Sequence, residues 1–251
     1  MLKVQEDLKV EGYTLAVPSV SVGNVGQLSV DLLISTLGMC RVGRIYDDCF
    51  IPLAGSDPYD ESSEDICTAV DVYVSHESKI VAVQIRSPLV RRPTSFFHEV
   101  LNFVTDRKIS RVIILTSSFG HEKRDKELRT VPFRYLATEN VTAECGKQFD
   151  ALSWITLEPK QDEFSGQSIL QIHGGGFAKT MFDLLQKENV PCTVILKFCS
   201  EGDNIPDACE LINYSNQWLK IIPVHDNNLC KLKFPPSWKF LFGNLPPKEL
   251  Y

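Results

Sequence analysis

The sequence lacks the long apolar runs and the basic charge that mark several common protein classes. No run approaches the ~20 apolar residues that a membrane-spanning helix needs, and residues 1–11 contain no apolar stretch like a signal-peptide core. The chain has 26 Lys and Arg against 32 Asp and Glu, a net charge of -6. Nucleic acids and anionic membranes attract basic surfaces. We therefore expect a soluble, intracellular protein that binds neither of them.

Closely spaced cysteines are also missing. The eight cysteines form no CxxC pair, and most stand inside apolar runs such as ILKFC. Structural zinc sites usually take their ligands from short, regular spacings. The sequence therefore predicts reduced cysteines in the core, with no metal site, no cofactor and no disulfide framework, at positions Cys40, Cys49, Cys67, Cys145, Cys192, Cys199, Cys209 and Cys230.

Two glycine turns precede predicted helices, SVGNVG at 21–26 and HGGGFAKT at 173–180. Free amides at a helix N-terminus can bind phosphate. The first turn has GxxG where a dinucleotide fingerprint needs GxGxxG, and Ala178 replaces a glycine that a phosphate loop requires. HGGG also occurs at esterase oxyanion holes, but the sequence contains no GxSxG nucleophile motif. We expect these glycines to serve tight turns and close packing; the alternative is an enzyme that binds a phosphorylated or nucleoside-like ligand there.

A third candidate site, SEGDNIPD at 200–207, follows an apolar strand and opens a helix, where open α/β sheets place ligands. Glu201, Asp203 and Asp207 could bind a metal or act as bases. Carboxylates are equally favoured in the first turn of a helix, where they cap free amides. We prefer capping, because no cationic partner or nucleophile stands beside them in the sequence.

The segment around the first glycine turn has very few charges, since Asp31 is the only charged residue between positions 12 and 40. Gln27 to Leu37 is predicted to be a helix, and Leu28 and Leu32 lie opposite its main apolar face. A helix that is apolar nearly all round must be covered on more than one side, by its own sheet and by another layer or a partner protein. We take Leu32 as a candidate partner-binding residue. The main face consists of Val30, Leu33, Ile34 and Leu37.

Strand and helix patterns alternate along the chain. The continuous apolar runs 111–116 and 192–199 are typical of parallel strands buried on both faces, and 69–74 with 79–85 alternate as in an antiparallel hairpin. Together they predict a layered α/β fold, with a mainly parallel sheet, flanking helices and one antiparallel hairpin. Residues 138–166 show no clear pattern. Further strands are expected at 13–17, 41–46, 133–137 and 168–172, and helices near 94–104, 177–188 and 204–219.

Two peripheral segments stand out. DPYDESSED at 57–65 carries five carboxylates and no base, but lacks the ligand spacing and central glycine of an EF-hand, so we expect a solvated loop. We expect a single domain at residues 1–233, followed by a docking segment and tail at residues 234–251. The aromatic part, WKFLF, can dock onto the body, and LPP is stiff. Leu250 and Tyr251 are suited to insertion into a partner's pocket.

Four stretches together resemble the proteasome assembly chaperone family: PSVSVGNVGQLSVDLLISTL at 18–37, TVPFRYL at 130–136, LKFCSEGDNIPDA at 196–208 and PPSWKFLFG at 235–243. The resemblance spans nearly the whole chain in order. It implies an α/β chaperone that is nucleoside phosphorylase-like in architecture, has no enzymatic role and pairs with proteasome assembly chaperone 1. The pair promotes assembly of the α-subunit ring of the proteasome core particle and prevents off-pathway ring dimerisation.

The resemblance also implies how such a chaperone holds its client. In this family the C-terminal tails reach pockets between adjacent α subunits, and they end in a hydrophobic residue, a tyrosine and any residue. Leu250 and Tyr251 are the matching residues here, although Tyr251 stands last where the family pattern has tyrosine next to last. A location in cytoplasm and nucleus follows from the same resemblance.

Overall fold

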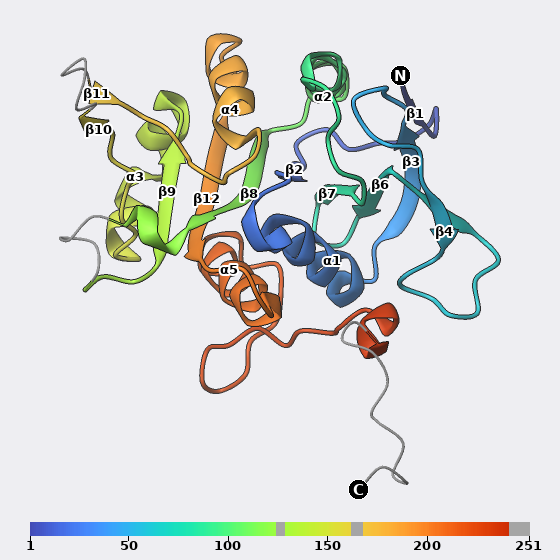
Figure 1. The fold of residues 1–251 in the computed structure, drawn as a ribbon. Coiled ribbons are helices and arrows are strands. Elements are labelled where there is room, and N and C mark those ends of the chain that lie inside the picture. The colour runs from blue at the N-terminus through green and yellow to red at the C-terminus, as the bar shows by residue number, and fades with distance from the viewer. Residues whose placement is uncertain (124–128, 162–167, 241–251) are drawn as a thin grey trace, which may run out of the picture.

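The computed structural model of this chain describes residues 1–123, 129–161 and 168–240 (Figure 1). A mixed, eight-stranded sheet runs through the middle of the molecule. In spatial order its strands are β1 (Leu2–Val4), β3 (Cys40–Ile45), β6 (Val70–Ser75), β7 (Ile80–Ile85), β2 (Thr14–Pro18), β8 (Arg111–Phe119), β12 (Cys192–Cys199) and β9 (Phe133–Ala137).

The centre of the sheet is parallel and its two flanks are antiparallel. β7, β2, β8 and β12 pair in parallel, whereas β6 and β7 form an antiparallel hairpin and β9 runs against β12. β8 and β12 stay in register from Val112 opposite Cys192 to Phe119 opposite Cys199. The layered α/β fold and the hairpin are thus confirmed. The two continuous apolar runs form adjacent central strands, because only a strand buried on both faces can be apolar throughout.

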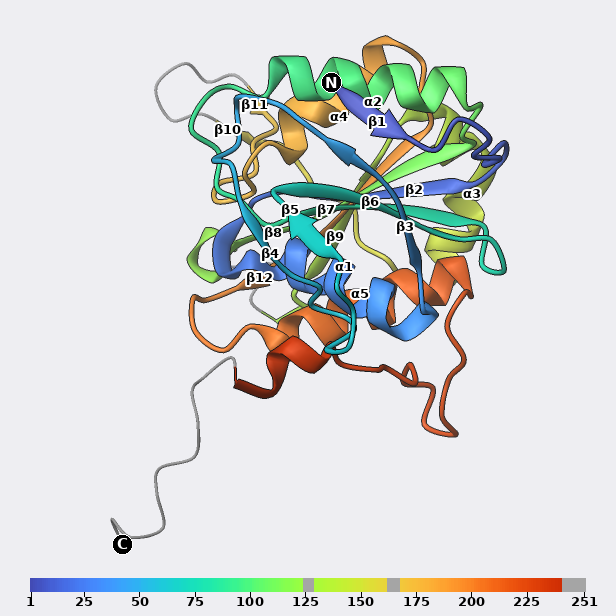
Figure 2. The same cartoon turned by 90° about the vertical axis from the view of Figure 1, so that its right-hand side faces the viewer.

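Helices cover both faces of the sheet, as Figure 2 shows with the sheet seen nearly edge-on. One face packs against α2 (Thr94–Asp106) and α4 (Ala178–Lys187), and the other against α1 (Val25–Leu37), α3 (Glu139–Ala151) and α5 (Ile205–Leu219). Side chains alternate between the two layers along β2: Leu15 and Val17 belong to the first core and Ala16 to the second. None of the described helices is both long and apolar enough to cross a membrane.

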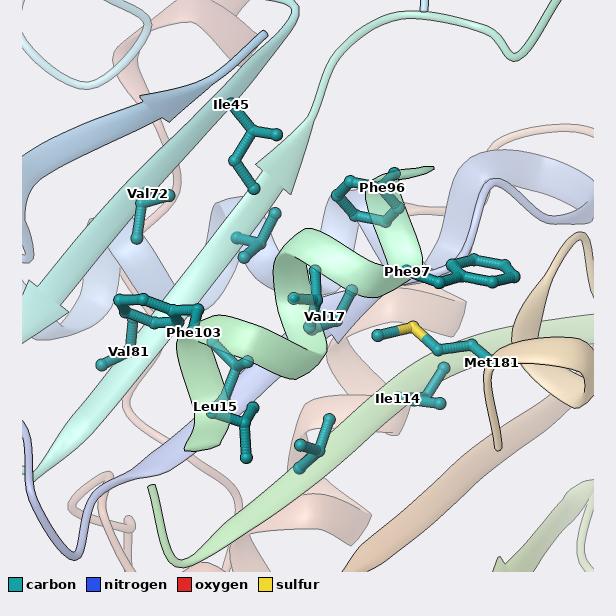
Figure 3. Packing of buried hydrophobic residues seen from close by; sticks show 14 of the residues in the cluster. Leu15, Val17, Ile45, Val72, Val81, Phe96, Phe97, Phe103, Ile114 and Met181 are labelled. Carbon is teal, nitrogen blue, oxygen red and sulfur yellow. The ribbon is translucent and has the colours of Figure 1, made fainter. Parts of the chain in front are cut away.

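The first core is dominated by aromatic and branched side chains (Figure 3). Phe103 of α2 lies beside Leu15 of the sheet, and Met181 of α4 beside Ile114. The ring of Phe177, just before α4, lies 5.4 Å from that of Phe97. These contacts fix the start of α4, and with it the position of the second glycine turn.

Two stretches differ from the predicted pattern. Residues 138–166 contain α3, a mostly polar helix whose buried side chains are Val141, Cys145 and Phe149, one every four residues. So sparse an apolar face escapes a periodicity search. The prediction of a strand at 168–172 is wrong in its extent. Only β11 (Ser168–Ile169) forms there, and it pairs with β10 (Lys160–Gln161) outside the main sheet.

The remaining elements are short. β4 (Ala54–Ser56) and β5 (Ile66–Thr68) form a small antiparallel sheet that brackets the acidic loop. Within the described residues, short 3-10 helices lie at η1 (Val22–Asn24), η2 (Gly120–Glu122) and η4 (Pro236–Phe240).

Candidate functional site

The two glycine turns meet at the carboxyl ends of β2 and β8, where open α/β sheets bind ligands. The backbone N–H of Val22 donates to the carbonyl of Gly174 over 2.8 Å. Ser19 joins the turns again, because its Oγ donates to the carbonyl of Gly175 (2.8 Å) and accepts from the N–H of Phe177 (2.9 Å). Each turn therefore binds the other.

Hydroxyl groups at the end of β8 complete this junction. Thr116 Oγ1 donates to the carbonyl of Gly175 (3.0 Å), and Ser118 Oγ to that of His173 (2.7 Å). Ser117 Oγ lies 2.8 Å from Ser21 Oγ and 2.5 Å from the Val22 carbonyl oxygen. The hydroxyl groups at this junction are therefore already bonded within the chain.

The glycines of the junction also leave little space. A β-carbon on Gly176 would lie 2.0 Å from the carbonyl oxygen of Val20, and one on Gly23 would lie 2.4 Å from Asn204 Oδ1. Both residues have a positive φ, which glycine adopts readily. The close approach predicted for these glycines is confirmed.

The acidic residues of the third candidate site lie at the start of α5. Asp203 Oδ1 accepts the N–H of Ile205, the first residue of the helix, as a capping carboxylate does. Asp207 behaves differently, because it forms an ion pair with Lys197 Nζ at 3.2 Å, and Glu210 approaches the same ammonium at 2.8 Å. The expectation that no cation stands nearby was therefore wrong. A lysine within the apolar run CTVILKFC was the sequence signal for it.

The ion pair around Lys197 is largely sheltered, since the lysine side chain is only 4% exposed. Burial lowers the pKa of Lys197, but hydrogen bonds and charge from Glu210 and Asp207 outweigh it, and the net pKa lies above the usual value. The pair therefore joins α5 to β12 as a structural contact. Among the described residues, no group of His, Cys, Asp and Glu is arranged to hold a metal ion.

A second buried polar cluster lies beneath the acidic loop, on the α1 side of the sheet. Asp31 Oδ1 of α1 accepts hydrogen bonds from the Tyr59 hydroxyl (2.6 Å), Gln84 Nε2 (2.6 Å) and Arg86 Nη2 (3.0 Å). Arg86 also donates to the Tyr59 hydroxyl over 2.7 Å. The loop is therefore not wholly solvated as expected, because Tyr59 anchors its first half to the body. The sequence signal that could have found this cluster is the isolation of Asp31, the only charged residue between positions 12 and 40.

Changing Tyr59 to phenylalanine is expected to lower the free energy of unfolding by about 1.5 kcal/mol, the range for hydrogen bonds to charged groups. Burial raises the pKa of Tyr59 well above its usual value, and the charge of Asp31 raises it further, so the hydroxyl stays protonated. Urea denaturation measures the loss. Tyr46→Phe, at a residue 50% exposed, is the control and should be neutral; equal stability of the two variants would contradict the structural role of the hydroxyl.

The docking segment expected after residue 233 does pack onto the body where it is described. η4 lies beside the acidic loop and below α1 (Figures 1 and 2). Ser237 N–H donates to the carbonyl of Pro58, and Lys239 Nζ lies 3.0 Å from Glu61 Oε1. Trp238 packs against the second core. The predicted tail residues Leu250 and Tyr251 lie outside the described residues.

The third predicted contact residue, Leu32, is fully buried within this chain. α1 packs against α5 on one side and against β2, β7 and β8 on the other. Ser29 of α1 donates to the carbonyl of Ala208 in α5 (3.4 Å). The second layer that this apolar helix requires is therefore α5, and the expectation that Leu32 faces a partner is corrected. Periodicity showed that the helix needs cover, but could not show which element supplies it.

Comparison with known proteins yields one consistent set of relatives. A family model described as the PAC2 family matches residues 15–219. Proteasome assembly chaperone 2 of Danio rerio is 40% identical over 246 residues, and that of Mus musculus 39% over 247, each match covering 94% of both chains. The crystal structure of Pyrococcus furiosus PbaA, described as an archaeal homolog of proteasome-assembly chaperone, shares the fold with a TM-score of 0.65 at 15% identity, covering 91% of this chain and 89% of PbaA.

Proposed function

This chain belongs to the PAC2 family, and we propose that it is a non-enzymatic chaperone of proteasome assembly. The observation that carries the proposal is its identity of about two residues in five with proteins named proteasome assembly chaperone 2, over 94% of the chain. A match of that extent leaves no large part of the fold unaccounted for. The chain forms a heterodimer with proteasome assembly chaperone 1, in the cytoplasm and nucleus.

The chemistry of the glycine junction supports a role without catalysis. Ser19, Thr116, Ser117 and Ser118 have their hydroxyls bonded to the chain itself. A nucleoside or phosphate would have to break several of these bonds and separate the turns at Gly176. The hydroxyls of this junction serve internal packing, which suits a protein whose task is to offer surfaces to other proteins.

The proposed mechanism is assembly by several linked contacts. The heterodimer holds α subunits of the core particle while their ring forms, and it blocks the face on which two rings would pair off-pathway. Linked weak contacts give high overall avidity, and a change at one of them is enough for release. One contact belongs to Leu250 and Tyr251, which enter a pocket between neighbouring α subunits. The packing of η4 against the acidic loop fixes where the segment that carries them begins.

Deletion of residues 248–251 is expected to weaken binding to the α ring about tenfold or more, because losing one of several linked contacts forfeits avidity. The heterodimer should be unaffected. Co-expression with proteasome assembly chaperone 1 and α subunits, followed by pull-down and mass measurement, tests both points. Lys248→Ala is the matched control and should bind as the wild type does. Unchanged ring binding by the deletion variant would overturn the role of the tail, and no α subunits in the wild-type pull-down would overturn the proposed function.

A further inference from the structure

The acidic loop at 57–65 contacts the body of the molecule through Tyr59. The Tyr59 hydroxyl donates to Asp31 Oδ1 over 2.6 Å and accepts from Arg86 Nη2 over 2.7 Å. The ring is held as well, since it lies edge-on to the ring of Tyr73 at 5.4 Å, and the guanidinium of Arg86 lies 5.3 Å from its centre. One side of the loop is therefore fixed to the buried cluster by both parts of a single side chain.

The other side of the loop contacts η4, which is far away in the sequence. Pro58, directly before Tyr59, accepts a hydrogen bond from the Ser237 N–H over 3.3 Å. Glu61, on the other side of Tyr59, forms the ion pair with Lys239 at 3.0 Å. η4 and the loop lie side by side in both views (Figures 1 and 2). A single short stretch of the loop thus joins η4 to the buried cluster.

η4 has few other polar contacts with the rest of the chain. Before it, the Lys233 N–H donates to Thr36 Oγ1, near the end of α1, over 3.0 Å. Trp238 packs against the second core, and its backbone N–H bonds within its own segment, to Pro235. In the part of the chain that the structure describes, η4 forms no further hydrogen bond or ion pair with another element. Its orientation about the Trp238 contact therefore depends on the loop.

Charge contributes to the contact between the loop and η4. Lys239 is the only charged residue of η4, and Glu61 is the carboxylate that it meets. Another loop carboxylate, Asp65, pairs instead with Arg41 of β3 at 2.8 Å. The side chains of Lys239 and Glu61 are 60% and 63% exposed. Exposed ion pairs are weak and are screened by salt, so this contact can open while Tyr59 keeps the loop on the body.

We propose that the acidic loop is a clasp that orients η4, with Tyr59 holding the loop to the Asp31 cluster and Glu61 holding Lys239. Because residues 241–251 follow η4 in the sequence, the clasp sets the point from which the tail contact starts. Tyr59 and Glu61 are thus positioning residues for that contact. This last step rests on the proposed function, because it assumes that the tail binds the α ring, whereas the clasp itself does not.

Amide hydrogen exchange of the full-length chain tests the clasp at the bond it holds. Tyr59→Ala is expected to speed exchange of the Ser237 amide about tenfold, because the loop loses both its ring contacts and its bond to a charged group. Tyr59→Phe keeps the ring and should speed it only about threefold. The Lys233 amide, bonded to Thr36, should stay within twofold of the wild type in both variants. General destabilisation would speed both amides alike, and that result would overturn the clasp.

Two glutamates of the loop form a matched pair for the charge contact. Glu61→Ala should speed exchange of the Ser237 amide about threefold at low salt and less at high salt, since salt screens the pair in the wild type too. Glu64, which has no ion pair among the described residues, is the control, and Glu64→Ala should leave the exchange rate unchanged. The double variant Glu61→Lys, Lys239→Glu restores opposite charges and should exchange nearly as the wild type does. Equal effects of Glu61→Ala and Glu64→Ala would overturn the role of Glu61.

Binding to the α ring tests the positioning role. In the co-expression pull-down, Tyr59→Ala should retain the heterodimer and bind the ring about threefold more weakly, because the tail contact no longer starts from a fixed point. The charge-swapped double variant should bind as the wild type does. Full ring binding by Tyr59→Ala, with loss of binding on deletion of 248–251, would overturn the positioning role alone. If the wild type bound no α subunits, the proposed function would fail, and the exchange results would still decide the clasp.

Discussion

Replacing Gly26 by alanine is expected to lower the free energy of unfolding by about 1–3 kcal/mol, the range for overpacking a well-packed site. Gly26 lies in the first turn of α1, and a β-carbon there would stand 2.4 Å from the carbonyl oxygen of Leu115 and 3.0 Å from that of Ser19. These atoms belong to adjoining backbone segments, since Ser19 N–H donates to the Leu115 carbonyl. Neither can move away alone. Urea denaturation followed by circular dichroism measures the effect.

Gly146 offers a control with the same substitution in another helix. A β-carbon there would meet only the Thr142 side chain, at an ordinary contact distance of 3.8 Å. Gly146→Ala should therefore stabilise α3 by up to about 1 kcal/mol, the difference in helix propensity between the two residues. The two substitutions should therefore change the free energy of unfolding in opposite directions. Equal effects would show that α1 does not approach the end of β8 as closely as the structure has it.

The central sheet could be predicted because burial on both faces leaves an unbroken apolar run in the sequence. The end of β8 could not be predicted to the same extent. The apolar run ends near Thr116, but the strand continues to Phe119, and Ser117 and Ser118 are buried there. Their hydroxyls are bonded to the two glycine turns. A buried serine whose hydroxyl is hydrogen-bonded to a backbone group distant in the sequence cannot be distinguished, in the sequence alone, from an exposed serine.

The candidate sites show the same limit. The sequence indicated that the glycines serve close packing, but the contacts between the turns join residues 156 positions apart, such as Ser19 and Gly175. It also showed Asp31 as an isolated charge in an apolar segment. It did not indicate Tyr59 as a partner, because that tyrosine stands within an acidic run whose composition is that of a solvated loop. Local pattern shows which groups need partners, and only the fold shows which groups meet.

Replacing Asp31 by alanine is expected to have the largest effect, a loss of about 3–5 kcal/mol in the free energy of unfolding, because it leaves a buried charge without its partner. The Arg86 side chain is only 16% exposed. Burial lowers the pKa of Arg86, but the charge of Asp31 outweighs this and raises it, so the guanidinium is charged when the pair is intact. The substitution also removes the acceptor of Tyr59 and Gln84. Thermal and urea unfolding measure the loss.

The exposed ion pair between Arg91 and Asp48 is the control that distinguishes the effect of burial from the effect of losing an ion pair. Its side chains are 68% and 74% exposed. Asp48→Ala should therefore change stability by only about 0–1 kcal/mol, as for other surface ion pairs. A loss as large as that of Asp31→Ala would show that the buried position of Asp31 does not determine its effect.

The double variant Asp31→Leu, Arg86→Met tests the physical cause. Replacing a buried ion pair by apolar residues is often close to neutral, whereas removing one partner is costly. The double variant should therefore be more stable than Asp31→Ala, although the Tyr59 hydroxyl still lacks its acceptor. Adding Tyr59→Phe to the double variant should then cost little, in contrast to its effect in the wild type, since the bonds it removes are already gone. If the substitutions were instead additive, the three side chains would stabilise the fold independently, and the acidic loop would not be coupled to α1 through this cluster.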